Sequence, residues 1–518
     1  MARIDLINDN INKTLVKMTI PMIFGMLGFV IFNVTDTFFI SRLGTTEMAA
    51  LTFTFPIVFI IGSMAMGLGQ GTSVLISRAY GSGDHEKATR YVTDSLILGV
   101  AIVTVLAIAG LLTIDKLFTF MGATPEMLVH IKAYMQVWYS CVFFVIIPMM
   151  GNAALRATGD TKTPGIIMSV SAITNIILDP IFIFGYGFIP AMGVRGAAIA
   201  TVLARTLTVI VSLYMLIVRE KLIKLKKEGI SERIRCMKEI LKIGTPVAFA
   251  RSMNPVGVAI ITNIMSKYGD KAVAAFGVSS RIEFLALCIT ISLANIMGPF
   301  VGQNIGAKKK NRVRDSIISA NIFSVILGFV FALLFYVFGE NIAGIFNKDK
   351  EVVKYIVMYL TVVPISYCLA GTIMISNSIL NVFKKSVQAS ALSLAQMFVI
   401  YIPLAYFLSG IFNVKGIFIA LALTFIISGI AGLLLVKNYY LKLSEIGHYK
   451  SNFGNIIKPG DSEVVKEGDR KSTKSTSLIH QKMFGEHFDS LFRGFKVCHP
   501  GMFLSRDLYF KSSTRTVY

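Results

Sequence analysis

Charged residues are scarce in this chain: Asp, Glu, Lys and Arg make up only 15% of its 518 residues, against 54% hydrophobic residues. Soluble domains carry about 25% charged residues, which solvate their surface. The mean hydropathy of +0.68 leaves too little polar surface to keep a chain of this length in water. The composition excludes a water-soluble protein and indicates an all-α integral membrane protein.

Residues for several other chemistries are few or badly placed. The five cysteines have no metal or redox spacing, and none of the six histidines lies in the middle of an apolar run. The sequence has no Gly-Lys-Ser/Thr loop for phosphate, and no nucleophile with a base, or metal triad, within the apolar runs. These absences argue against an ATP-driven pump, a histidine proton relay and an enzyme, and they call for no cofactor.

Long apolar runs are what the chain has in abundance. A membrane-spanning helix needs about 20 mostly apolar residues. Twelve runs qualify: 16–41, 51–77, 92–113, 133–155, 164–186, 197–218, 243–266, 274–303, 316–338, 355–380, 388–408 and 416–436. The sequence therefore predicts twelve transmembrane helices.

Lys and Arg cluster in alternate loops, most densely from Arg219 to Lys242. The positive-inside rule then places both termini in the cytoplasm. The protein is expected in the cell (plasma or inner) membrane. The net charge of +22 is explained by loops that touch anionic lipid headgroups and needs no nucleic acid. Residues 219–242 are expected to form an amphipathic helix on the cytoplasmic surface.

The sequence repeats itself with a shift of 225 residues, which superposes Pro21 on Pro246, Gly44 on Gly269 and Gly81 on Gly306. Two six-helix units follow, and because six is even, both begin on the same side of the membrane. We expect two lobes related by a pseudo-two-fold axis along the membrane normal, with a cleft between them. The predicted parts are an N-terminal lobe at 1–218, a linker at 219–242, a C-terminal lobe at 243–440 and a disordered tail at 441–518.

Two acids interrupt the apolar runs of the first repeat only. Asp36 and Asp179 fall opposite Ile261 and Ile402 in the second repeat. A carboxylate at membrane depth costs roughly 2.5–3.5 kcal/mol on insertion scales, so such acids usually face a partner, an ion or water. Their one-sided placement favours a functional role over a structural one.

Two more polar residues are expected beside the acids. Asn175 lies four residues before Asp179, on the same helix face, and Thr201 falls at a similar depth in the next span. Carboxylate, amide and hydroxyl oxygens suit a small hard cation such as Na⁺, while two adjacent acids can share a proton. The cluster therefore predicts a site for H⁺ or Na⁺, although Asn175 and Thr201 also fit an interhelical hydrogen-bond network.

Several strings resemble the multidrug and toxic compound extrusion (MATE) family over roughly residues 10–440: Asn33–Gly44 after Pro21, Leu155–Pro164, Asn175–Pro180 and Gly193–Thr201. The resemblance implies secondary antiporters that expel amphiphilic, often cationic compounds in exchange for H⁺ or Na⁺. It also implies that Asp36, Asn175, Asp179 and Thr201 form the N-lobe cation site. Relatives with a second site carry acids in spans seven and ten, and this chain has none in either span.

The remaining expectations concern substrate and motion. Met26, Phe29, Phe32 and Asn152 are expected to line the substrate cavity, with Arg251, Asn254, Asn295 and Gln303 on the other lobe. Pro21 and Pro180 are expected to act as hinges. Arg281 and Glu283 are expected to compensate each other's charge at a helix end, with a role in gating as the alternative.

The expected partners are small amphiphilic molecules and membrane lipids, and the protein is expected to be a monomer. A lipid-linked sugar flippase would need a strongly cationic cavity, which the two acids disfavour. That function and metabolite export on the same scaffold remain the alternatives.

Overall fold

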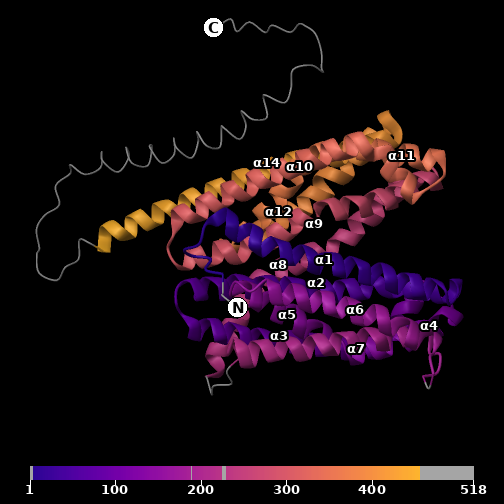
Figure 1. Cartoon of the computed structure of the whole chain (residues 1–518), viewed down its shortest axis with the longest axis horizontal. Coiled ribbons are helices and arrows are strands. Elements are labelled where there is room, and N and C mark those ends of the chain that lie inside the picture. The colour runs from indigo at the N-terminus through magenta and orange to yellow at the C-terminus, as the bar shows by residue number, and fades with distance from the viewer. Residues whose placement is uncertain (1–3, 188, 224–228, 455–518) are drawn as a thin grey trace, which may run out of the picture. The chain divides into compact units, whose positions relative to one another are not determined.

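The computed structural model describes residues 4–187, 189–223 and 229–454, and these are almost entirely helical (Figure 1). The first repeat folds into α1 (Ile11–Ser41), α2 (Thr45–Gly81), α3 (His85–Phe120), α4 (Pro125–Ser140), α5 (Phe143–Ala157), α6 (Lys162–Phe184), α7 (Gly193–Tyr214) and η1 (Met215–Arg219). The second folds into α8 (Ile230–Ser266), α9 (Asp270–Gly306), α10 (Lys310–Phe346), α11 (Lys350–Val362), η2 (Pro364–Ser366), α12 (Tyr367–Val382), α13 (Ser386–Leu394), η3 (Ala395–Tyr401) and α14 (Ile402–Gly454).

The helices account for the twelve predicted spans. Among the described residues, nine helical stretches are long and apolar enough to cross a membrane, or ten if the bent pair α4 and α5 is one span. The last stretch, Ser386–Leu441, has room for two spans, and it is broken where Asn413 leaves helical geometry at φ 52° and ψ −138°. Helix α8 supplies the twelfth span, although Arg251, Asn254 and Asn263 interrupt its apolar run.

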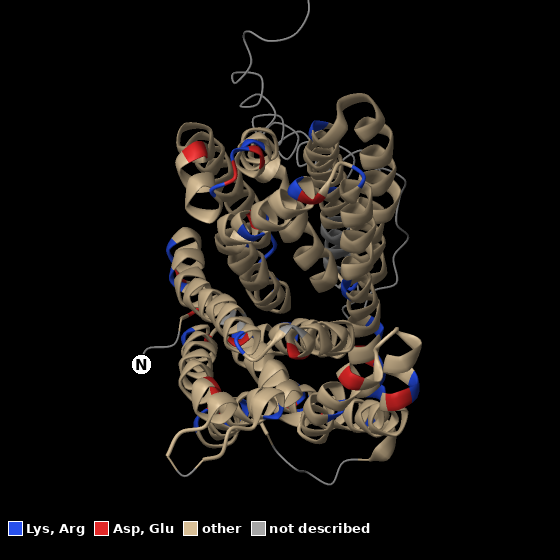
Figure 2. Cartoon of the chain, turned by 90° about the vertical axis from the view of Figure 1, so that its right-hand side faces the viewer, with Lys and Arg blue, Asp and Glu red and all other residues tan. Residues whose placement is uncertain are grey.

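The outer faces of these helices are apolar. Large hydrophobic side chains such as Phe24, Val105, Leu112 and Phe407 are 63–79% exposed. Figure 2 views the bundle from one end and shows few charged residues along the ribbons. Contiguous apolar surface of this kind needs a covering, and lipid tails supply it for a bundle of spanning helices.

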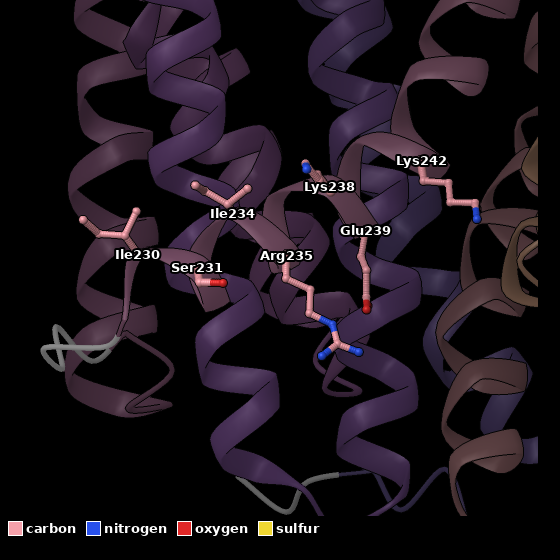
Figure 3. A pocket seen from close by; sticks show the side chains of 7 residues that line it. All are labelled: Ile230, Ser231, Ile234, Arg235, Lys238, Glu239 and Lys242. Atoms are coloured by element: carbon pink, nitrogen blue, oxygen red, sulfur yellow. The ribbon is translucent and has the colours of Figure 1, made fainter.

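The predicted linker at 219–242 is not a separate surface helix. Residues from Ile230 onward form the first turns of α8, because neither Pro nor Gly interrupts the helix before Gly244. These turns pack on α3, where the Tyr91 hydroxyl donates to Glu239 at 2.6 Å and Arg90 pairs with Glu232 at 3.1 Å. Figure 3 shows a shallow pocket over them, lined by Ile230, Ser231, Ile234, Arg235, Lys238, Glu239 and Lys242.

The chain divides into two compact units after Asn438. The first unit contains both lobes. The described part of the second unit, residues 439–454, continues as helix. The prediction of a disordered tail falls largely on residues 455–518, which lie outside the described residues.

The two lobes meet along α2, which packs on α8 and α9 of the second lobe. Small residues allow this approach at the end of the bundle where α1 begins, which we call the amino-terminal end. A Cβ atom added to Gly81 would lie 2.0 Å from the backbone oxygen of Gln303, and one added to Gly306 would lie 2.2 Å from that of Arg78. The Gln303 amide also donates to the Ala157 carbonyl at 2.7 Å. Gln303 therefore closes this end and does not line a substrate cavity.

The segment before α1 also joins the lobes. Leu6 is only 1% exposed, and its carbonyl accepts hydrogen bonds from Asn304 at 3.0 Å and from Arg312 at 3.3 Å. Lys309 donates to the Ile7 carbonyl at 3.1 Å. These bonds connect residues about 300 positions apart and hold the segment on the second lobe.

The segment is shaped by Asp5, whose carboxylate accepts from the amides of Ile7 and Asn8 and from the Asn8 side chain at 2.7 Å. The side-chain hydrogen bond from Asn8 is the main reason that the pKa of Asp5 lies below its usual value. A depressed carboxyl pKa stabilises the folded turn at neutral pH. That stabilisation is lost as pH falls through the lowered pKa.

Arg312→Ala is expected to destabilise the protein by roughly 1.5–3 kcal/mol, because charge-assisted hydrogen bonds to buried carbonyls are lost. Thermal unfolding of the detergent-purified protein measures this effect. Arg314→Ala is the matched control, since Arg314 pairs only with its neighbour Asp315 among the described residues. Equal unfolding temperatures for the two variants would contradict the role given to Arg312.

Candidate functional site

The centre of the first lobe contains a buried polar cluster built on α6. Asn175 and Asp179 lie one turn apart on this helix, and both are 0% exposed. The Asn175 side-chain nitrogen donates to Asp179 Oδ1 at 2.9 Å and lies 3.5 Å from Thr201 Oγ1 of α7. The structure thus brings these three predicted residues together across two helices.

Asp36 reaches the same cluster from α1. Helices α1 and α6 pack closely because glycines face each other: a Cβ atom added to Gly25 would lie 3.2 Å from the Cα of Gly165. The charge of Asp36 acts directly on Asp179. Two helices that touch through glycine therefore hold two acids near each other in the interior of the lobe.

Three oxygens of the cluster are buried and accept no hydrogen bond within the described part of the chain: Asp36 Oδ1, Asn175 Oδ1 and Asp179 Oδ2. A buried acceptor without a donor costs about 1–3 kcal/mol, and more when it is charged. A proton on one acid would supply a donor, and Na⁺ would coordinate the carboxylate, amide and hydroxyl oxygens. The donor set fits either ion.

Sequence reasoning missed two residues of this site, Tyr134 on α4 and Arg205 on α7. The phenol of Tyr134 is within electrostatic range of Asp36, Asp179 and Arg205. The Arg205 guanidinium lies over the ring of Phe32, 5.3 Å from its centre. Its position four residues after Thr201, on the same helix face, is the sequence signal that could have identified it.

The other predicted residues have mixed placements. Phe32 and Met26 are partly buried on α1, while Asn152 on α5 is 7% exposed with its Oδ1 unpaired among the described residues. The side chain of Phe29 lies outside the described residues. Pro21 and Pro180 are inside helices that continue through them, α1 and α6, so their hinge role stays a prediction.

The expected charge compensation between Arg281 and Glu283 is wrong. Residues two positions apart on a helix do not face each other, and the partner of Glu283 is the hydroxyl of Tyr359 on α11. The side chain of Arg251 on α8 is exposed at the protein surface.

Comparison with known proteins agrees with this architecture. The family model MatE matches residues 21–181 and again 246–407, one match in each lobe. The FAD transporter of Shewanella oneidensis is 33% identical over 430 residues, covering 82% of this chain and 94% of that protein. The multidrug export protein MepA of Staphylococcus aureus is 27% identical over 82% of this chain and 93% of its own length.

Solved structures give the same result. The MATE transporter VcmN of Vibrio cholerae in its bent form has a TM-score of 0.78 at 29% identity, covering 83% of this chain and 97% of that one. A multidrug resistance MATE transporter in an outward-facing conformation has a TM-score of 0.80 at 25% identity, covering 86% and 99%. With the family model matched in both lobes and the fold shared, this multi-pass membrane protein belongs to the MATE family of transporters.

Proposed function

We propose that this protein is a secondary antiporter that exports amphiphilic, often cationic compounds in exchange for H⁺ or Na⁺ by alternating access. The observation that carries the proposal is a set of three buried oxygens, on Asp36, Asn175 and Asp179, that have no donor among the described residues. Helices α1 and α6 thus bring together carboxylate and amide oxygens that a bound cation or a proton would satisfy. Multidrug export by MepA, at 27% identity, supports the substrate class.

The coupling follows from where the acids lie. Neutralising Asp36 and Asp179 removes the repulsion between α1 and α6, which otherwise pack through Gly25 and Gly165. Helix α1 can then change its path at Pro21, where one backbone donor is missing, and move Phe32, which is expected to line the substrate cavity. Export requires only that the ion and the substrate prefer different conformations.

Proteoliposomes with separately imposed proton and sodium gradients test the proposal. Efflux of a fluorescent amphiphilic cation is expected to follow one of the two gradients and to stop when that gradient is collapsed by an ionophore. Transport that persists without either gradient would overturn the antiport mechanism.

A second candidate substrate is a flavin dinucleotide, which makes the protein a metabolite exporter. The FAD transporter of Shewanella oneidensis is 33% identical along nearly its whole length. Arg205 beside the polar cluster and the exposed Arg251 on α8 offer guanidinium groups, which bind phosphates in a bidentate manner. A multidrug cavity for cations has no need of these two charges.

The two substrates can be separated with Arg205→Gln and Arg251→Gln. Each is expected to reduce FAD export about 10- to 150-fold, the equivalent of one charge-assisted hydrogen bond of roughly 1.5–3 kcal/mol. Export of an amphiphilic cation should be kept. Arg195→Gln, at an exposed position of α7, is the control. FAD export by both arginine variants at the control's rate would exclude this role.

A further inference from the structure

The second lobe contains a buried acid of its own, in a span where no acid was assigned a role. Glu283 lies on α9, partly buried, and its carboxylate accepts a hydrogen bond from the Tyr359 hydroxyl of α11. Tyr359 is 1% exposed. No basic side chain forms an ion pair with Glu283 within the described residues. An unpaired carboxylate inside an apolar span costs free energy of desolvation, as the acids of the first lobe do.

Two further phenols approach the same carboxylate. The charge of Glu283 acts on Tyr367 at the start of α12 and on Tyr401 of η3. These tyrosines are 1% and 5% exposed, and neither hydroxyl has a hydrogen-bond partner in the described part of the chain. Buried hydroxyls are normally paired. One acid and three phenols therefore meet here from α9, α11, α12 and η3. Two of the phenols have hydroxyls that make no hydrogen bond among the described residues.

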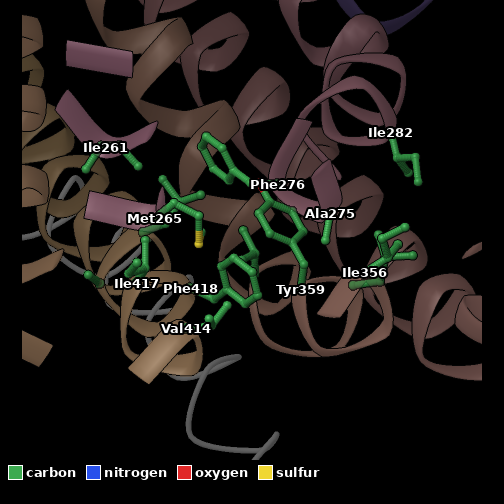
Figure 4. Close-up of a cluster of buried hydrophobic side chains, with 14 of the residues drawn as sticks. Ile261, Met265, Ala275, Phe276, Ile282, Ile356, Tyr359, Val414, Ile417 and Phe418 are labelled. Carbon is green, nitrogen blue, oxygen red and sulfur yellow. The ribbon is translucent and has the colours of Figure 1, made fainter. Parts of the chain in front are cut away.

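The internal repeat shows that this cluster is a counterpart of the first site built with different residues. Tyr134 is the tenth residue of α4, and Tyr359 is the tenth residue of α11. Each phenol lies near the acid of its lobe. The position of Asp36 is taken in the second lobe by Ile261, which belongs to the apolar cluster around Tyr359 and Phe418 (Figure 4). Both lobes thus have a tyrosine at this position of the repeat. The acid beside it comes from α1 in the first lobe and from α9 in the second.

The composition of the cluster selects the ion. Na⁺ prefers several carboxylate or carbonyl oxygens, and this cluster offers one carboxylate where the first site offers two. One carboxylate surrounded by phenols can instead take up one proton from water and become a neutral acid, which donates to a phenol oxygen.

We propose that Glu283, with Tyr359, Tyr367 and Tyr401, is a second proton-binding site, so that the second lobe takes up and releases a proton during transport. This inference rests on the proposed antiport, which the first-lobe acids drive. It assigns to each lobe an acid that gains or loses charge, and it gives the C-terminal lobe a means to respond to pH without Asp36 or Asp179.

The test reads protonation directly, so that it does not depend on transport. In pH-difference infrared spectra of purified protein in lipid, Glu283→Gln is expected to remove one carboxylic acid C=O band that persists in Asp36→Asn and Asp179→Asn. Glutamine keeps an acceptor oxygen for Tyr359, so the fold is expected to be retained. Tyr359→Phe should shift the midpoint at which the band appears. Glu340→Gln, at an exposed carboxylate of α10, is the control.

The outcomes are separable from those of the proposed function. In proteoliposomes with a pH-sensitive dye inside, Glu283→Gln should move one proton fewer per exported substrate, while the first-lobe variants should move none. A Glu283→Gln spectrum and proton count equal to those of the unmodified protein would overturn the second site and leave the antiport intact. An absence of transport driven by either a proton or a sodium gradient in the unmodified protein, with the Glu283 band still titrating, would overturn the antiport alone.

Discussion

Asp179→Asn is expected to abolish efflux while leaving the protein in the membrane, and Asp36→Asn is expected to do the same. Asparagine keeps the shape of aspartate, and its oxygen can still accept the hydrogen bond that Asn175 donates at 2.9 Å. It cannot take up a proton or balance a cation. The cluster would remain folded but would lose the charge that distinguishes the loaded state from the empty one, and with it the coupling.

Drug resistance of cells that express each variant, compared with membrane abundance, measures this loss. Asp115→Asn is the matched control, because Asp115 is an exposed acid on α3 that pairs with Lys132 at 2.8 Å. Resistance equal to that of the unmodified protein in either first-lobe variant would remove that acid from the site. Loss of protein from the membrane would be a folding effect, and the control separates the two.

Gly306→Ala is expected to prevent the amino-terminal end of the bundle from closing. The added Cβ would lie 2.2 Å from the backbone oxygen of Arg78, and backbone cannot move aside as a flexible side chain can. Overpacking costs roughly 1–3 kcal/mol. Because this contact exists only when the lobes are together at that end, the cost falls on one state and shifts the equilibrium about 5- to 150-fold toward the other.

Labelling of a single cysteine at Ala157 in a cysteine-free background reports on this equilibrium, since Ala157 is 0% exposed beside Gln303. Gly306→Ala should raise the labelling rate and lower transport. Gly277→Ala on the same helix is the control, because a Cβ there meets nothing within 4 Å. Labelling at the same rate in both variants would show that the glycine crossing does not close this end.

The fold and the first-lobe cluster were accessible from sequence because both depend on local pattern. Twelve apolar runs predict twelve spans, and the spacing of Asn175 and Asp179 puts them on one helix face. A constant repeat offset then predicts the two lobes. These inferences need only helix geometry and the cost of charge in lipid.

The Glu283 site was not accessible in this way. Its neighbour Arg281 suggested charge compensation, but the partner Tyr359 lies 76 residues away on another helix, and helix packing alone brings them together. Arg205 is a different case, since its spacing of four residues from Thr201 puts it on the same helix face, but only the packing of α4 and α1 on α7 shows that it lies beside Tyr134 and Phe32. The hydrogen bond from Asn304 to the Leu6 carbonyl is likewise a tertiary contact. Its two residues are too far apart in the sequence for any local pattern to predict it.

That contact has a consequence for biosynthesis. Leu6 leaves the ribosome about 300 residues before its partners Asn304 and Arg312, a delay of roughly 15–60 s at 5–20 residues per second. During that interval the carbonyls of the leading segment have only water or lipid headgroups to bind. The contact that holds the start of the chain therefore forms only after α8 and α9, the first two spans of the second lobe, have been synthesised.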